Sequence, residues 1–137
     1  MPADKVFLDS NLLVYLYSHT EQEKANRVID VICNNNCFIS TQVLNEFSNV
    51  CIRKLGFAIS DIKKAISEIA AACHLLYINE NDIFLALRIH NEYKYSYYDS
   101  LMIASALESG CNYLFSEDMS DGQIINSSIT IKNVFKL

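Results

Sequence analysis

The chain has 137 residues, of which 51% are hydrophobic and 20% charged. This length corresponds to about one domain, and we expect a single domain over residues 1–137. The apolar content, with only three glycines and one proline, excludes a disordered, collagen-like or linker-type chain. The net charge of −5 is opposite in sign to the basic surface of a general nucleic-acid binder, so only a local basic patch could serve that role.

The sequence indicates a protein of the cytoplasm that does not contact a membrane. Its longest apolar stretch, Ile69–Ile78, contains His74 and is far shorter than the roughly 20 residues that a bilayer-spanning helix needs. Residues 1–9 lack the charged-then-apolar pattern of a secretory signal. The five cysteines are odd in number and form no Cys-x-x-Cys pair, so we expect reduced, mostly packed thiols.

Short strands and helices are predicted to alternate along the chain. Apolar, β-rich runs predict strands at residues 5–8, 37–40, 75–78, 113–115 and 129–131. Helical periodicity predicts helices at residues 12–17, 21–36, 41–55, 61–72, from 79 or 81 to about 93, and 98–109. Gly56 is expected as a C-cap and Ser60 as an N-cap. The alternation predicts an α/β sandwich with a mainly parallel central sheet of four to five strands.

Acidic residues follow two of the predicted strands. Asp9 ends the first strand, and Asp118 comes just after the strand at residues 113–115, with Asp121 three residues further on. In an open parallel sheet, ligands bind beyond the carboxyl ends of the strands. If these two strands are neighbours, their carboxylates converge at one edge of the sheet.

Two further acidic residues belong to predicted helices. Asp99 stands at the start of an apolar helix, where the helix dipole favours a negative charge. Glu46 lies at the border of the apolar stripe of its helix, on a flank that it shares with Gln42 and Arg53. We therefore expect the Glu46 carboxylate to be partly covered.

Each of these acids alone has an ordinary explanation as a helix cap, a turn former or a solvated charge. Together they have a different meaning, because carboxylates that converge in a partly desolvated cleft repel one another unless protons or cations neutralise them. Oxygen ligands without Cys or His favour Mg²⁺ or Mn²⁺ over Zn²⁺. Mg²⁺ bound in this way keeps waters and phosphate oxygens as further ligands, which implies a substrate that carries phosphate.

Four segments contain acidic residues in the order Asp, Glu, Asp, Asp. They are VFLDSN at 6–11, the helix from Asn45-Glu46 to Arg53-Lys54, YDSLMIASA at 98–106, and SEDMSDGQ at 116–123. In this order, and over nearly the whole chain, they resemble the motifs of PIN-domain ribonucleases, especially the VapC toxins of type II toxin–antitoxin systems. The sequence departs from the commonest toxin pattern at Tyr98, where many members have Trp, and at Asp121, where many have His.

The resemblance implies a PIN fold and Mg²⁺- or Mn²⁺-dependent cleavage of RNA by a metal-activated water. The implied catalytic residues are Asp9, Glu46, Asp99 and Asp118. The implied metal ligands are Asp9, Asp99, Asp118 and Asp121, with Ser10 and Ser116 as supporting polar groups. The resemblance does not decide whether one or two ions bind. The resemblance further implies a cognate antitoxin that blocks the acidic pocket, and a homodimer.

Basic and aromatic residues add candidates for contacts with RNA. Arg53 and Lys54, beyond Glu46 on its helix, are candidates for binding phosphate, although a solvated helix end would explain them equally well. Tyrosines cluster just before the last predicted helix, at residues 93, 95, 97 and 98. They could stack on bases, but packing around the helix start or in an interface is favoured.

Several other functions are disfavoured by the sequence. A haloacid-dehalogenase-type phosphatase needs a second Asp two residues after the first, where this chain has Asn11. Dinucleotide binding lacks its Gly-rich turn, and nucleotide hydrolysis lacks its P-loop. The remaining alternative is a non-catalytic PIN-like module that binds RNA or protein, which is expected to lack some of the four acids.

Overall fold

The central sheet has six strands in the order β3-β2-β1-β4-β6-β5 in the computed structural model, which describes residues 3–136. All neighbouring strands are parallel except β5 and β6, which are antiparallel. The strands are β1 (Lys5–Leu8), β2 (Asn36–Ser40), β3 (His74–Leu76), β4 (Tyr113–Phe115), β5 (Ile124–Ile125) and β6 (Ile129–Lys132). The predicted α/β sandwich with a mainly parallel sheet is therefore confirmed. The sheet has six strands rather than the four to five expected, and the unexpected strand is the two-residue β5.

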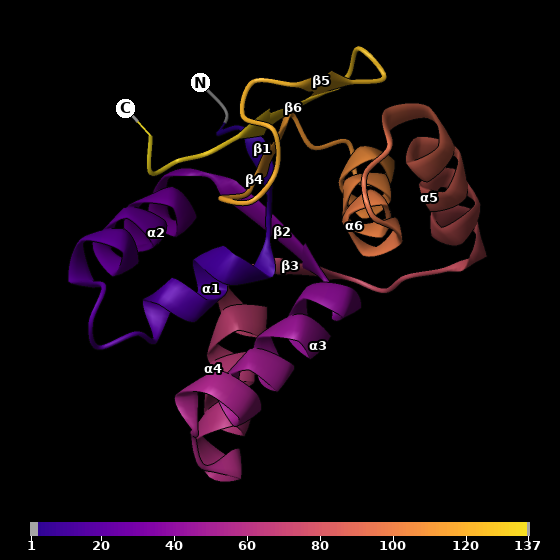
Figure 1. Ribbon diagram of the computed structural model, residues 1–137. Helices are drawn as coiled ribbons and strands as arrows, with labels where there is room; N and C mark the ends of the chain where they lie inside the picture. Colours follow the sequence, from indigo (N-terminus) through magenta and orange to yellow (C-terminus); the bar gives the residue numbers. More distant parts are fainter. Residues whose placement is uncertain (1–2, 137) are drawn as a thin grey trace.

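Helices flank the sheet on both sides (Figure 1). In that view α1 and α2 lie on one side of the strands, α5 and α6 lie on the other, and α3 and α4 extend below. The helices are α1 (Ser10–Leu16), α2 (Gln22–Asn34), α3 (Thr41–Val50), α4 (Ile59–Ala72), α5 (Glu80–Tyr93) and α6 (Tyr97–Glu108). None of the helices described for residues 3–136 is long and apolar enough to cross a lipid bilayer.

Strand β1 occupies the middle of the sheet. Its residues Val6, Phe7 and Leu8 are fully buried, and it pairs with β2 on one side and β4 on the other. The backbone N–H of Asp9 continues this pairing by donating to the carbonyl of Phe115 at 3.0 Å. An apolar strand buried on both faces therefore delivers Asp9 to the centre of the carboxyl edge of the sheet.

Helix α6 is the most deeply buried helix, as its apolar sequence predicts. Residues 100–106 are all buried, between α5 and the sheet. Its first turn carries Asp99, and the hydroxyl of Ser96 caps it by accepting a hydrogen bond from the Asp99 backbone N–H at 3.1 Å. The burial of α6 fixes the start of the helix, and with it the position of Asp99.

Some boundaries differ from the expected ones. The helix predicted at 21–36 ends at Asn34, because Asn36 already pairs in the sheet as the first residue of β2. Helix α4 begins at Ile59 after Ala58, without a side-chain cap, so the prediction of Ser60 as the N-cap is wrong. Helix α3 passes into a π-helical turn, η1 (Cys51–Leu55), which ends at Gly56 in the left-handed conformation as predicted.

The cysteines are free thiols, as expected. Cys37, Cys51, Cys73 and Cys111 are buried, and only Cys33 is exposed. A small apolar role explains the four buried residues.

Candidate acidic active site

Asp9 is held by hydrogen bonds at the end of β1. Its carboxylate is 6% exposed and accepts bonds from the Ser10 backbone N–H at 2.6 Å and from the Ser116 hydroxyl at 2.7 Å. Burial raises the pKa of Asp9, the two hydrogen bonds oppose this rise, and the charges of Asp99 and Asp118 add to it. Asp9 is thus both the N-cap of α1 and a carboxylate that lies within electrostatic reach of two others.

Ser116 connects Asp9 to Asp118. Its side chain is 1% exposed, and its oxygen accepts a hydrogen bond from the Asp118 backbone N–H at 3.2 Å while donating to Asp9. Asn11 holds the same region from α1, because its Nδ2 donates to Asp118 Oδ2 at 2.9 Å. The ends of β1 and β4 are therefore joined by side chains as well as by the sheet.

Asp99 approaches this pair from α6. Burial raises its pKa, the hydrogen bond with Ser96 opposes the rise, and the charge of Asp118 adds to it. Asp99 in turn raises the pKa of Asp9. Three carboxylates predicted from separate segments are thus electrostatic neighbours.

Glu46 approaches from α3 and is half-buried. Its pKa is raised to about 7, first by burial and then by the charge of Asp9, with a smaller contribution from Asp99. The Gln42 amide, one helical turn earlier, opposes this shift by hydrogen bonding to the carboxylate. The expectation of a partly covered Glu46 is met.

Asp121 occupies a different position from the other four acids. It is exposed, and its Oδ1 accepts a hydrogen bond from the Asn133 backbone N–H at 2.7 Å. It is not among the charges that shift the pKa values of Asp9, Glu46 and Asp99. One of its oxygens therefore anchors the segment after β6, and its role as a metal ligand stays a prediction.

The two predicted phosphate contacts, Arg53 and Lys54, lie in η1 with exposed side chains. η1 follows directly on α3, the helix that carries Glu46. Both cations remain available to an approaching polyanion, and their contact with substrate stays a prediction.

The four central acids fit a hard cation by the chemistry of their donor atoms. All four offer carboxylate oxygens, and in Asp9, Glu46 and Asp99 burial and the charges of neighbouring acids raise the pKa. A divalent cation relieves this cost of ionisation. Within residues 3–136, no three Asp, Glu, His or Cys side chains are already gathered closely enough to hold a metal ion. The four acids therefore interact electrostatically but are not yet close enough together to coordinate one ion.

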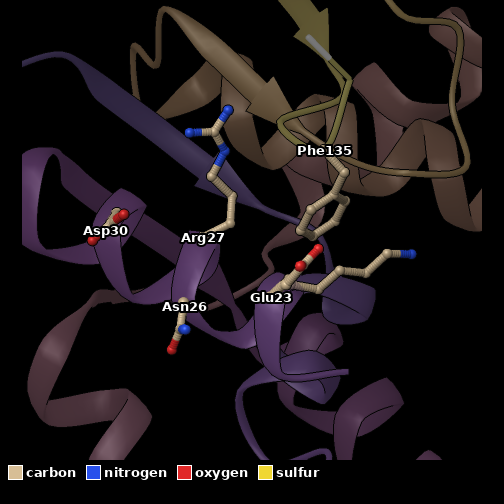
Figure 2. Close-up of a pocket in the computed structure, with 6 residues that line it drawn as sticks. Glu23, Asn26, Arg27, Asp30 and Phe135 are labelled. Carbon is tan, nitrogen blue, oxygen red and sulfur yellow. The ribbon is translucent and has the colours of Figure 1, made fainter. Parts of the chain in front are cut away.

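Of two concave regions of the surface, one borders the four acids and the other does not. A cavity of about 440 Å³ is bounded by Glu46 and other residues of α3 together with the first turns of α6. A larger hollow of about 510 Å³ lies between α2 and the C-terminal segment, away from the four acids. Figure 2 shows Arg27 and Phe135 at this second hollow, where Arg27 Nε donates to the Val134 carbonyl at 2.9 Å. The second hollow is the seam where the C-terminal segment packs on α2.

Sequence analysis did not identify three residues that organise the loop after β4. Glu117 accepts hydrogen bonds from Lys24 and from the Tyr15 hydroxyl, each at 2.6 Å. Although burial raises the pKa of Glu117, these two bonds outweigh it and lower the pKa. Nothing in the local pattern indicates this triad, because Glu117 is 93 residues from Lys24 and 102 residues from Tyr15. Asn11 was also missed, although its place two residues after Asp9 was a usable signal.

Comparison with known proteins agrees with this arrangement. The family model described as PIN domain matches residues 6–120. No curated protein sequence matches the chain. Solved structures that are similar include VapBC2 of Rickettsia felis bound to a promoter DNA fragment, with a TM-score of 0.70, 16% identity, and coverage of 94% of this chain and 98% of that one.

Two other similar structures are named as toxins. VapC20 of Mycobacterium tuberculosis, described as a toxin that cleaves the sarcin–ricin loop, has a TM-score of 0.65 at 17% identity and covers 82% of this chain and 91% of its own. A toxin–antitoxin complex of Klebsiella pneumoniae has a TM-score of 0.72 at 13% identity, and the match covers 96% of this chain and 99% of that one. At these identities the likeness concerns the fold. With the family match over most of its length, the chain belongs to the PIN domain family.

Proposed function

We propose that this protein is a Mg²⁺- or Mn²⁺-dependent endoribonuclease of the VapC toxin type. The observation that carries the proposal is the mutual electrostatic reach of Asp9, Asp99 and Asp118 at the carboxyl edge of a parallel sheet. The family match and the fold shared with VapC20, named as a toxin that cleaves the sarcin–ricin loop, support RNA as the substrate. The retention of all four acids favours catalysis over a binding-only module.

Asp9, Asp99 and Asp118 would hold the cation, with Asp121 as a further candidate ligand. When bound, the ion lowers the pKa of a water and stabilises charge on the leaving oxygen of the phosphodiester. Ser116 and Ser10 orient Asp9 so that it presents its carboxylate toward the other acids. Asn11 restrains Asp118 in the same way.

Glu46 completes the proposed set as the acceptor of a proton from the attacking water. It borders both the acidic cluster and the 440 Å³ cavity, so it can contact a substrate that reaches from one to the other. Arg53 and Lys54 would contact RNA phosphates beyond the site. Because the chain outside the acidic cluster has little net charge, these local cations and the bound ion would supply the attraction for RNA.

The proposal includes the partners implied by the toxin type. A cognate antitoxin would cover the acidic cleft, and two copies of this chain would form a homodimer in the cytoplasm. The similar structure from Klebsiella pneumoniae is described as a toxin–antitoxin complex and that from Rickettsia felis as VapBC2, which supports the first partner.

Cleavage of a mixed RNA pool that includes tRNA tests the proposal. The purified chain, free of bound antitoxin, is incubated with Mg²⁺ or Mn²⁺ beside a chelator control and Asp99→Asn. Asp61→Asn is the matched control, because Asp61 is also an acid in the first turn of a helix but is exposed on α4. We expect cleavage by the wild type and Asp61→Asn only. Equal cleavage by Asp99→Asn would point to contamination, and folded protein that binds RNA without cutting it would favour the non-catalytic module.

A further inference from the structure

Glu117 directly precedes the proposed metal ligand Asp118, yet its side chain is bound elsewhere. Its Oε1 accepts a hydrogen bond from the Tyr15 hydroxyl, and its Oε2 accepts one from Lys24 Nζ, each at 2.6 Å. The charge of Glu117 is not among those that raise the pKa of Asp9. The carboxylate next to Asp118 is therefore held by α1 and α2 and does not take part in the acidic cluster.

Lys24, the cation of this network, is held from several sides. Its Nζ lies 4.5 Å from the centroid of the Tyr15 ring and 5.2 Å from that of Phe135, both within the range of cation–π attraction. The two rings meet edge-on, with their centroids 5.3 Å apart. Nζ also donates a hydrogen bond to the Tyr15 hydroxyl at 3.1 Å. The ammonium group is thus fixed by two rings, a hydroxyl and a carboxylate, whereas a solvated lysine side chain samples many rotamers.

The network ties the loop after β4 to the helix that begins after Asp9. Tyr15 belongs to α1, and Asp9 is the N-cap of this helix. The residues on either side of Glu117 bind in the same region, since Ser116 donates to Asp9 and Asp118 accepts from the first turn of α1. Three consecutive residues of the loop are therefore each bound to α1 or to its cap.

This arrangement affects the position of the loop more than the stability of the fold. An ion pair at the protein surface usually contributes little to stability. The side chains of Lys24 and Glu117 are 31% and 26% exposed, so solvent screens their attraction in part. Without the lysine, however, the Glu117 carboxylate would be free to leave α2, and it lies one residue from Asp118. The loss would therefore be felt first in the placement of Asp118.

We propose that Lys24 is a positioning residue for the metal ligand Asp118. By binding Glu117, Lys24 keeps Asp118 at the carboxyl edge of the sheet, where it can bind a divalent cation together with the other acids. The inference rests on the proposed function for the cation, but neither Lys24 nor Glu117 contacts the ion. Because Lys24 acts through Glu117, removing either side chain should have the same effect as removing both.

Binding of Mn²⁺ to the purified chain, measured by isothermal titration calorimetry, tests this role without relying on RNA cleavage. We expect Lys24→Met to weaken Mn²⁺ binding about tenfold, at the lower end of the range for losing an outer partner of a metal ligand. Lys24→Arg keeps a cation that pairs with carboxylates and stacks on aromatic rings, so it should restore most of the affinity. Glu117→Ala should weaken binding by itself, and adding Lys24→Met to it should cause no further loss.

Arg27→Met is the matched control. Arg27 is also a cation of α2, and its Nε donates to the Val134 carbonyl of the C-terminal segment rather than to Glu117. This variant should bind Mn²⁺ like the wild type. Amide hydrogen exchange in EDTA gives a second readout that needs no metal, and circular dichroism checks the fold of each variant. The Asp118 N–H, which donates to the Ser116 hydroxyl, should exchange faster in Lys24→Met than in Arg27→Met.

Wild-type affinity for Mn²⁺ in Lys24→Met, or an equal loss in Arg27→Met, would overturn the positioning role. A further loss on adding Lys24→Met to Glu117→Ala would overturn it too, because Lys24 would then act by another route. None of these results affects the nuclease proposal as long as the wild type binds Mn²⁺. A wild type that binds no Mn²⁺ would instead overturn the metal site itself. The exchange of the Asp118 amide would then decide the rest: faster exchange in Lys24→Met supports its hold on the loop, and unchanged exchange overturns it.

Discussion

The hydroxyl of Ser116 donates a hydrogen bond of 2.7 Å to Asp9 Oδ2, across a separation of 107 residues in sequence. The same oxygen accepts from the Asp118 backbone. One buried side chain thereby fixes the relative positions of two proposed metal ligands. Its contribution can be measured separately from that of the ligands themselves.

Replacement of Ser116 by Ala should reduce RNA cleavage by about 10- to 100-fold, the usual effect of losing a partner of a metal ligand. The hydrogen bond lowers the pKa of Asp9, so its loss should raise that pKa further. The acidic limb of the pH–rate profile should therefore move to higher pH, and the concentration of Mg²⁺ needed for half-maximal rate should increase. Ser67→Ala, at an exposed position on α4, serves as the control. Unchanged metal dependence in Ser116→Ala would show that Asp9 needs no such support.

Glu46 should make the metal-free protein less stable as the pH rises. Its carboxyl group ionises near 4.5 when unfolded and at about 7 when folded. Between these values the folded state binds more protons than the unfolded state, so the free energy of unfolding falls with increasing pH. Asp9 and Asp99, whose pKa values are also raised, act in the same direction.

Glu46→Gln should remove part of the decrease in the free energy of unfolding that accompanies a rise in pH. Unfolding by urea in EDTA at pH 5 and pH 8 should show a smaller decrease for the variant, by about 1–2 kcal/mol, because solvent screens a half-buried group. Glu68→Gln, at an exposed position on α4, should behave like the wild type. A wild-type stability that rises between pH 5 and pH 8 would contradict the shifted pKa values.

Divalent cations should stabilise the protein through the same acids. At a Mg²⁺ or Mn²⁺ concentration of 100 times its Kd, the free energy of unfolding should increase by about 2.7 kcal/mol. Asp99→Asn should lose most of this increase. In EDTA the same variant should melt no lower than the wild type, since the substitution relieves repulsion with Asp9 and Asp118. Thermal melts with and without the ion measure both effects, and an equal response in Asp99→Asn would remove it from the ligand set.

Arg53 and Lys54, the basic pair in η1, should contribute equally to the affinity for RNA of any sequence. Arg53→Ala combined with Lys54→Ala should weaken binding to all sequences alike and reduce the dependence of affinity on salt, because phosphate contacts release counterions. Lys63→Ala with Lys64→Ala, an exposed basic pair on α4, provides a control of equal charge change. If both double variants bind RNA equally well over a salt titration, the pair in η1 has no special role.

The sequence predicted the sheet well because its strands are short apolar runs whose ends are marked by polar residues. Asp9 shows this, since it ends a strand that is fully buried on both faces. By contrast, β5 has two residues and depends on its antiparallel pairing with β6, which no local pattern encodes. The π-helical turn after Val50 was likewise not predicted, because its apolar spacing is also compatible with an α-helix.

For the site, sequence indicated which acids meet but not what holds them. Asp9, Asp99 and Asp118 were identifiable from their places at strand and helix ends, where topology alone brings them together. The supporting bonds from Asn11 to Asp118 and from Lys24 to Glu117 join residues more than ninety positions apart. Such pairs become visible only when β1 and β4 lie side by side.

The central place of β1 has a consequence for the order of synthesis. The first strand of the chain finds its second neighbour, β4, only after residue 115 has been made, and Asp118 follows it. Pairing between such distant segments is slow compared with local helix formation. A growing chain on the ribosome therefore carries Asp9, Glu46 and Asp99 before the strand that leads to Asp118 exists, and the acidic cluster is complete only after residue 118 has been made.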